Sequence, residues 1–182
     1  MPIPDFQSIM LPLLKYTADQ REHSMRDAEQ YIADYFKLNE EERRQRTPSG
    51  LQRTIYNRVH WAKTDLIKAG LFTKNGRSFK IAERGQELLK KNLQCIDRAY
   101  LAENFPEFAE YKNQRGLEAK IGQVSDLKDS DTQTPEEMFE YGYQQIRKNL
   151  SQEILTAVKE ASPEFFEKLA VELLVKLGYG GT

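Results

Sequence analysis

The sequence has little of what marks a secreted, membrane-bound or zinc-binding protein. It contains one cysteine, Cys95, so no disulfide can form within the chain. Its two histidines, His23 and His60, are far apart and give no Cys/His spacing typical of zinc. No stretch approaches the roughly 18 consecutive apolar residues of a membrane span, and no basic residues precede the apolar N-terminal stretch. These absences predict a cytoplasmic protein that binds neither membrane nor metal.

Internal repeats and a phosphate-binding glycine loop are also missing, and the stretch GYGG at residues 178–181 is too short to count as one. What the chain does have is charge, with 30% charged residues that nearly cancel to a net charge of -1. Residues 43–91 contain 13 Lys and Arg against 3 acidic residues, a net of +10, which leaves -11 for the remainder. This segregation favours a surface that faces a polyanion such as nucleic acid, with an ordinary solvated surface as the alternative.

Apolar residues at helical spacing predict two amphipathic helices, over residues 5–18 and 25–37, and Ser24 suits the N-cap of the second. Ser49 and Gln52 have the spacing of a capping box, so they predict the start of a third helix. Gly70 predicts its end.

A β-hairpin is predicted immediately after the third helix, because the pair Asn75-Gly76 between two short apolar stretches suits the positive φ angles of a type I′ turn. Helices followed by a two-stranded hairpin are typical of a winged helix-turn-helix, with the hairpin as the wing. The predicted fold class is therefore mainly α with a small β-hairpin, a winged helix-turn-helix domain followed by a helical C-terminal segment.

The third helix has two faces at 100° per residue. One face is apolar and is expected to pack on the core; it carries Ile55, Val59, Ala62, Leu66 and Ala69. The opposite face is expected to read DNA, and it carries Arg53, Asn57, His60, Thr64 and Lys68. Arg and Asn can bond guanine and adenine edges in the major groove, whereas the other three can reach bases or phosphates. A plain solvated face is the alternative.

Two residues lie on the flanks of this helix. Arg58 can bond a phosphate or pair internally with a carboxylate, and both roles stay open. Trp61 is expected to pack against a neighbouring element rather than to stack on a base.

The wing is expected to approach the phosphate backbone through Lys74, Asn75, Arg77 and Lys80. Cations at such a tip supply affinity through counterion release but carry little sequence information. Polar residues at a hairpin tip can also serve solubility alone.

Several elements, in order and with similar spacing, resemble the N-terminal domain of Mrr-type restriction proteins over about residues 4–91. They are PLL, PSG, NRVHWAKTDLIKAGL and ERGQELL. Downstream, FFEKLAVELL and GYGG resemble the entry into the Mrr nuclease domain. The resemblance covers almost the whole chain.

The resemblance implies a modification-dependent, type IV restriction system. In that family a winged helix helps to recognise foreign, typically methylated, duplex DNA, and it is tethered to a nuclease of the PD-(D/E)xK class that uses Mg²⁺. This sequence reaches Thr182 before the family's metal-binding Asp and the strand that carries the catalytic Lys. Glu167 matches a helix-borne acid near that site, but one carboxylate cannot position a metal and activate water. No catalytic or metal-binding residue, and no cleavage by this chain alone, is therefore expected.

The predicted organisation has three parts: a winged-helix DNA-binding domain at 1–91, a helix and polar linker at 92–133, and a connector helix with the first helix of a truncated nuclease domain at 134–182. Thr134, Pro135 and Glu137 predict the start of the connector helix, and Ser162-Pro163 predicts a break before a last helix at 163–177. The apolar residues of that last helix need the preceding helix or a second copy of the chain to cover them.

Three functions remain open at this point. The first is the duplex-DNA-binding module of an Mrr-type restriction system. The second is a non-catalytic winged-helix regulator that acts as a homodimer, and the third is a protein-interaction module whose wing contacts an acidic partner. The sequence does not indicate a preferred base or methylation type.

Overall fold

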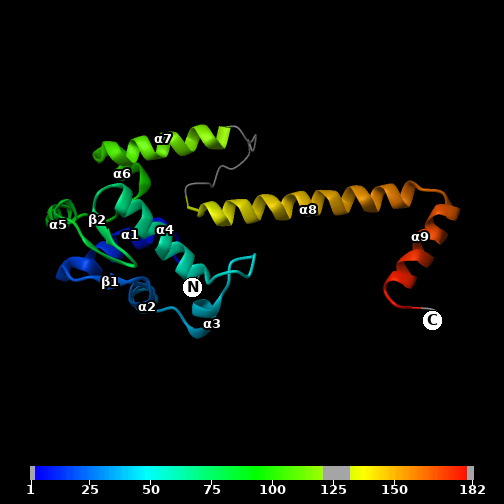
Figure 1. Cartoon of the computed structure of the whole chain (residues 1–182), viewed down its shortest axis with the longest axis horizontal. Helices are drawn as coiled ribbons and strands as arrows, with labels where there is room; N and C mark the ends of the chain where they lie inside the picture. Colours follow the sequence, from blue (N-terminus) through cyan, green and yellow to red (C-terminus); the bar gives the residue numbers. More distant parts are fainter. Residues whose placement is uncertain (1–2, 121–131, 180–182) are drawn as a thin grey trace. The chain divides into compact units, whose positions relative to one another are not determined.

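The computed structural model describes residues 3–120 and 132–179 (Figure 1). The chain divides into two compact units, Met1–Met138 and Phe139–Thr182. The boundary predicted after residue 91 lies inside the first unit.

The first unit begins with α1 (Phe6–Tyr16), a 3₁₀ turn η1 (Thr17–Asp19) and α2 (Met25–Tyr35). The Asp5 carboxylate caps α1 by accepting from the backbone N–H of Gln7 at 2.9 Å. Ser24 caps α2 as predicted, because its hydroxyl accepts from the backbone N–H of Asp27 at 3.2 Å.

A short helix, α3 (Glu40–Arg44), and the longer α4 (Thr54–Lys68) follow. The predicted capping box of Ser49 and Gln52 is wrong: the N-cap of α4 is Arg53, without a side-chain cap. Residues 47–52 instead form a loop, in which the N–H of Thr47 donates to the carbonyl of Gln52 at 2.9 Å. The C-terminal end was predicted correctly, since Gly70 adopts a φ of 71° just after α4.

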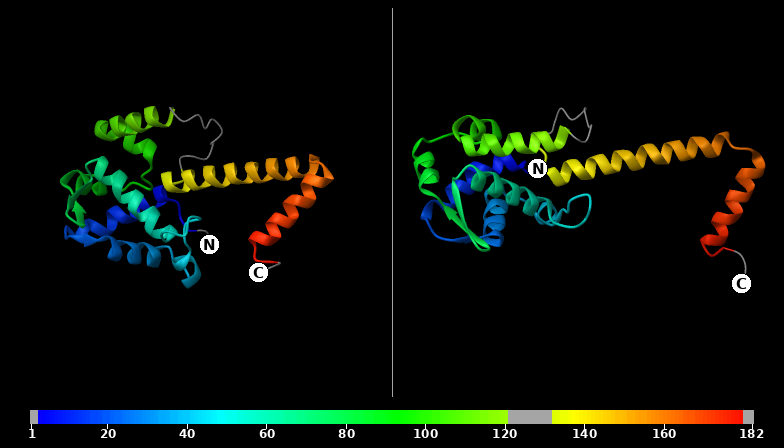
Figure 2. Two further views of the ribbon diagram at one scale, coloured as in Figure 1. Left: turned by 45° about the vertical axis from the view of Figure 1, so that its right-hand side comes forward. Right: turned by 45° about the horizontal axis from the view of Figure 1, so that its top comes forward.

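Three strands form one antiparallel sheet in the order β1-β3-β2. They are β1 (His23–Ser24), β2 (Phe72–Asn75) and β3 (Ser78–Ile81), and Figure 2 shows the β2–β3 hairpin, in green, beside the helices of this unit. The element order α1-β1-α2-α3-α4-β2-β3 is a winged-helix-like arrangement, and the predicted mainly α fold class with a small hairpin is confirmed. The short strand β1 was not predicted.

The turn of the hairpin differs from the prediction. Asn75 pairs with Ser78 as the last residue of β2, so the two loop residues are Gly76 and Arg77. Gly76 has a φ of 57°, whereas neither Asn75 nor Arg77 has a positive φ. This sign pattern fits a type II′ turn, in which only the first loop residue needs a positive φ, rather than type I′.

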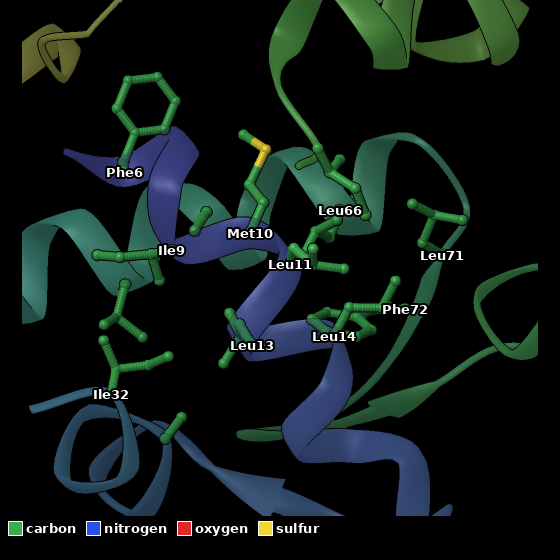
Figure 3. Packing of buried hydrophobic residues seen from close by; sticks show 14 of the residues in the cluster. Phe6, Ile9, Met10, Leu11, Leu13, Leu14, Ile32, Leu66, Leu71 and Phe72 are labelled. Atoms are coloured by element: carbon green, nitrogen blue, oxygen red, sulfur yellow. The ribbon is translucent and has the colours of Figure 1, made fainter. Parts of the chain in front are cut away.

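The core lies between α1 and α4 and extends to α2 and the sheet (Figure 3). Fully buried side chains of α1 include Phe6, Ile9, Met10, Leu13 and Leu14. From α4, Ile55, Val59, Ala62 and Leu66 are buried, as the apolar face predicted, and Ala69 is buried just after the helix. The core therefore fixes which side of α4 is turned outward.

Helices α5 (Glu83–Lys90), α6 (Arg98–Asn104) and α7 (Pro106–Lys120) complete the first unit. Gly85 allows α5 to approach the sheet, since a Cβ there would lie 2.5 Å from the carbonyl oxygen of Leu71. The Arg98 guanidinium pairs with the fully buried Asp65 of α4 at 2.6 Å. Within the region predicted as one helix and a polar linker, residues 92–97 are not helical, and two helices cover Arg98–Asn104 and Pro106–Lys120. Residues 121–131 of the predicted linker lie outside the described residues.

The connector helix α8 (Pro135–Glu160) begins in the first unit, and α9 (Pro163–Lys176) follows it in the second. Both predicted starts are confirmed: Thr134 and Glu137 form a capping box, and the Ser162 hydroxyl caps α9. The large apolar side chains of α9 are exposed, so they are not buried against α8. Even the 26-residue α8 lacks the apolar length that crossing a membrane requires, and the same holds for every other described helix.

Candidate nucleic-acid interface

The outward side of α4 carries four of the five residues predicted there. These four differ in solvent exposure and in the contacts that their side chains make. Arg53 is half exposed and holds the buried carboxylate of Glu29 at 2.8 Å. Burial raises the pKa of Glu29, and the Arg53 guanidinium opposes this rise. His60 keeps solvent access although neighbouring side chains partly enclose it, and Thr64 is half-buried with its hydroxyl donating to the carbonyl of His60 at 2.8 Å. The hydroxyl proton of Thr64 is therefore already used in a hydrogen bond within the helix.

The expected exposure of Asn57 is wrong. Its side chain is only 1% exposed, and its Oδ1 accepts from the hydroxyl of Thr134 at 2.6 Å. Thr134 is itself fully buried at the start of α8. In this arrangement the first turn of α8 covers Asn57, so its amide is not available to a base edge.

Arg58 and Trp61 lie on the same covered flank of α4. Arg58 donates to the carboxylate of Glu137 at 2.9 Å and to the backbone carbonyl of Ile3 at 2.6 Å. The indole N–H of Trp61 donates to the carboxylate of Glu136. Of the two roles open for Arg58, the structure shows the internal carboxylate pair, and Trp61 contacts a neighbouring element as expected. Together with the Asn57–Thr134 bond, these contacts form the α8 anchor.

Lys68 lies at the C-terminal end of α4, away from the other outward residues. Its ammonium is 5.1 Å from the centre of the Tyr111 ring on α7, a cation–π distance. Lys68 is exposed, so it remains a predicted backbone contact.

Three basic side chains gather where α4 meets the wing: His60 and Lys63 from α4, and Lys74 from β2. The Lys63 ammonium lies 5.8 Å from the centre of the Phe79 ring, and Phe79 is the cross-strand partner of Lys74. Partial burial lowers the pKa of Lys63, and Lys74 lowers it further. The pKa of His60 is lowered chiefly by partial burial, then by Lys63, with Lys74 adding to this and Glu136 opposing it. The ammonium groups of Lys63 and Lys74 repel each other, and with the His60 imidazole they form the α4–wing cluster. An approaching anion would offset the repulsion and favour the charged form of each side chain.

The predicted wing residues lie on two faces of the hairpin. Phe72 is buried, and since side chains alternate along a strand, Lys74 shares its face. Lys80 lies between the buried Phe79 and Ile81 and is on the opposite, exposed face. Asn75 shares that outer face and donates to the Glu22 carboxylate at 2.7 Å. Arg77 is exposed in the turn. Only Lys74 thus sits beside the basic residues of α4.

Lys63 was missed by the face analysis of the sequence, although it was counted among the basic residues of segment 43–91. Its neighbourhood with Lys74 depends on how the hairpin folds back onto α4, which no spacing within α4 reveals. The three-residue spacing of His60 and Lys63 indicates that these two lie on one side of α4, but it does not indicate that Lys74 lies beside them.

The Mg²⁺ that the resemblance implies for a full-length nuclease has no fitting donor set in residues 3–120 and 132–179. Within those ranges, no three His, Cys, Asp or Glu side chains are placed to hold a metal ion. Glu167 is exposed on α9, and Cys95 is an exposed free thiol.

The comparisons with known proteins concern the part of the chain that carries α4 and the wing. Residues 6–91, which span α1 to α5, match the family model of the Mrr N-terminal domain. The whole chain is 25% identical over 187 aligned residues to the "Type IV methyl-directed restriction enzyme EcoKMrr" of Escherichia coli (strain K12). Residues 6–91 are therefore similar to the Mrr N-terminal domain. The chain spans 61% of the length of that relative. No solved structure matches the chain.

The Mrr-type resemblance places the α4–wing cluster inside the matched domain, whereas the α8 anchor joins that domain to residues beyond it. Asn57, Arg58 and Trp61 lie within residues 6–91, and their partners Thr134, Glu136 and Glu137 lie outside.

Proposed function

We propose that this chain is the DNA-binding part of an Mrr-type, modification-dependent (type IV) restriction system. It binds duplex DNA through α4 and the wing, and it carries no nuclease centre of its own. The relative named above is a methyl-directed restriction enzyme, so methylated duplex DNA is the proposed target.

The α4–wing cluster is the observation that carries this proposal. Among the described residues, no carboxylate is paired with Lys63 or Lys74, and burial together with mutual repulsion lowers the pKa of Lys63. A phosphate between the two ammonium groups would replace this repulsion by attraction and release counterions. The net charge of +10 over residues 43–91 supports the same polyanion.

The proposed contacts are of two kinds. Arg53 and His60, on the exposed side of α4, are the candidates for base contacts in the major groove. Lys63, Lys68, Lys74, Arg77 and Lys80 are candidates for phosphate contacts.

A matched pair of double variants tests the proposal. Lys63→Ala/Lys74→Ala should weaken duplex binding and reduce the log–log salt slope by roughly two units, about one per lost phosphate contact. Lys148→Ala/Lys159→Ala removes two exposed lysines of α8 and should change neither. Fluorescence anisotropy at several salt concentrations measures both, and equal effects of the two double variants would remove the cluster from the interface.

Two further assays test the remaining parts. Methylated and unmethylated duplexes of one sequence should differ in affinity if recognition is modification-dependent. In the presence of Mg²⁺ the purified chain should leave DNA intact, and cleavage that disappears in Glu167→Ala would contradict the lack of a nuclease centre.

A further inference from the structure

A cavity of about 460 Å³ lies beside the N-terminal end of α4, with walls from α2, α3 and α4. This volume is within the range of about 300 to 1,000 Å³ that small-molecule sites occupy, and it exceeds what a phosphate group alone would fill. Three features of its wall indicate what it can hold: guanidinium groups, an open carboxylate oxygen and an aromatic ring.

The guanidinium groups belong to Arg26, Arg43 and Arg53. Arg43 is held through Nε by the Leu38 carbonyl at 2.8 Å and through Nη2 by Asp34 at 2.7 Å. Arg26 is exposed and has no ion pair among the described residues. Glu29 is the only carboxylate among the lining residues, so the described wall is net positive and suits an anionic group.

Glu29 presents one oxygen to the cavity. Its side chain is 7% exposed, and Oε2 is bonded to the Arg53 guanidinium at 2.8 Å. Oε1 has no hydrogen bond to a described residue. No fully buried side-chain nitrogen or oxygen of the described residues lacks a partner, so Oε1 keeps some solvent access, and Glu29 lines the cavity. A carboxylate oxygen in this position accepts from an amino group.

Tyr56 supplies the aromatic wall, and its position connects the cavity to the outward side of α4. It lies three residues after Arg53 and four before His60, so the three share one stripe of the helix. The cavity is therefore one turn from the α4–wing cluster, at the end of α4 that typically enters the major groove.

We propose that the cavity holds one unpaired nucleotide of the bound DNA whose base carries an exocyclic amino group. The phosphate lies against Arg26 and Arg43, the base packs beside Tyr56, and the amino group donates to Oε1 of Glu29. Adenine, cytosine and guanine meet this requirement, whereas thymine has no amino group. The inference rests on the proposed DNA binding and names a subsite within it.

Titration of the full chain with single nucleotides tests the cavity apart from duplex binding. By calorimetry, dAMP and dCMP should bind about tenfold more tightly than dTMP or inorganic phosphate. Glu29→Gln should abolish this preference, and Tyr56→Ala should weaken all three nucleotides while leaving phosphate unchanged. Glu167→Gln, an exposed change on α9, should alter nothing. Equal binding of dAMP, dCMP and dTMP by the unchanged chain, or a preference that persists in Glu29→Gln, would overturn the proposal.

A second arm uses DNA. A duplex with a single unpaired adenine should bind about tenfold more tightly than the same duplex with an unpaired thymine. Tight binding of both duplexes with equal affinity would overturn the subsite and leave the proposed function standing. Nucleotide preference without any duplex binding would instead overturn the proposed function and reduce the cavity to a site for free nucleotides.

Discussion

The N-terminal unit and the helical arm of residues 139–179 treat apolar side chains in opposite ways. In the unit, large apolar residues such as Leu13 and Leu66 are fully buried. In the arm, Phe139 is 77% exposed and Leu173 is 56% exposed, although α8 and α9 also carry apolar residues at helical spacing. An amphipathic pattern therefore predicts a helix and its apolar face, but burial requires a second layer that the pattern does not supply.

The two regions also differ in charge. Segment 43–91 of the N-terminal unit carries +10, whereas residues 139–179 hold five basic and six acidic residues. The arm therefore has no net positive charge that would attract a polyanion. The excess of cationic charge lies in the N-terminal unit and the exposed apolar residues lie mainly in the arm, while α8 extends from its anchor on α4 into the arm.

The largest expected difference between the two regions is in the stability lost when one acidic side chain is removed. Asp65→Ala leaves the Arg98 guanidinium without its buried partner, so the free energy of unfolding should fall by about 3 to 5 kcal/mol. Glu167→Ala removes an exposed charge of α9 and should change it by less than about 0.5 kcal/mol. Chemical denaturation followed by circular dichroism measures both. A small effect of Asp65→Ala would mean that α6 does not hold to α4 as the structure shows.

The same comparison can be made with apolar residues. Leu13→Ala opens a cavity in the core and should cost about 2 to 5 kcal/mol, whereas Leu173→Ala should be nearly neutral. If Leu173→Ala costs as much as Leu13→Ala, another surface covers α9 in solution. Light scattering would then show whether that surface is a second copy of the chain.

The outcome of the sequence predictions follows the same division between local and distant causes. The caps at Ser24 and Thr134, and the helix break at Ser162-Pro163, were predicted correctly because each depends on residues within three positions. The position of the hairpin was predicted correctly, but its turn type was not. The sequence allows either Asn75 or Gly76 to begin the loop, and the pairing of Asn75 with Ser78 decides between them.

Two predictions were wrong, the exposure of Asn57 and the start of α4. In both cases the cause is a contact that the spacing of residues does not reveal. Asn57 is buried by Thr134, 77 positions further along the chain. The first turn predicted for α4 is replaced by a loop in which Arg46 bridges to Arg53. The contact across 77 positions depends on the tertiary arrangement, whereas the Arg46–Arg53 bridge is a local turn that competes with the predicted capping box. The cavity beside Glu29 was equally invisible, because its walls come from three separate helices.

The α8 anchor gives a third prediction, at the point where the two regions meet. Thr134→Val leaves the Asn57 amide oxygen buried without its donor, which should destabilise the anchor by about 1 to 3 kcal/mol. Trp61 is the chain's one tryptophan and bonds to Glu136, so its fluorescence reports on the anchor. We expect the emission to shift in Thr134→Val and to stay unchanged in Thr156→Val, an exposed threonine of α8. Unchanged emission in both would mean that α8 is not anchored through Thr134.

The smallest expected effect is the pH dependence of the α4–wing cluster. The pKa of His60 in the folded chain lies below the ordinary value of 6.5, chiefly through partial burial, so the unfolded chain binds more protons in that range. Stability should therefore fall slightly as the pH drops from about 7 through 6.5 and then through the lowered pKa. A bound phosphate has the opposite effect, because it favours the charged imidazolium, so duplex affinity should rise a few-fold over the same range.

His60→Gln should remove both trends, whereas His23→Gln, beside Asp19 and outside the proposed interface, should retain the change in affinity. Anisotropy titrations at several pH values measure it, and an affinity that rises equally in His60→Gln would place the responsible group outside the cluster.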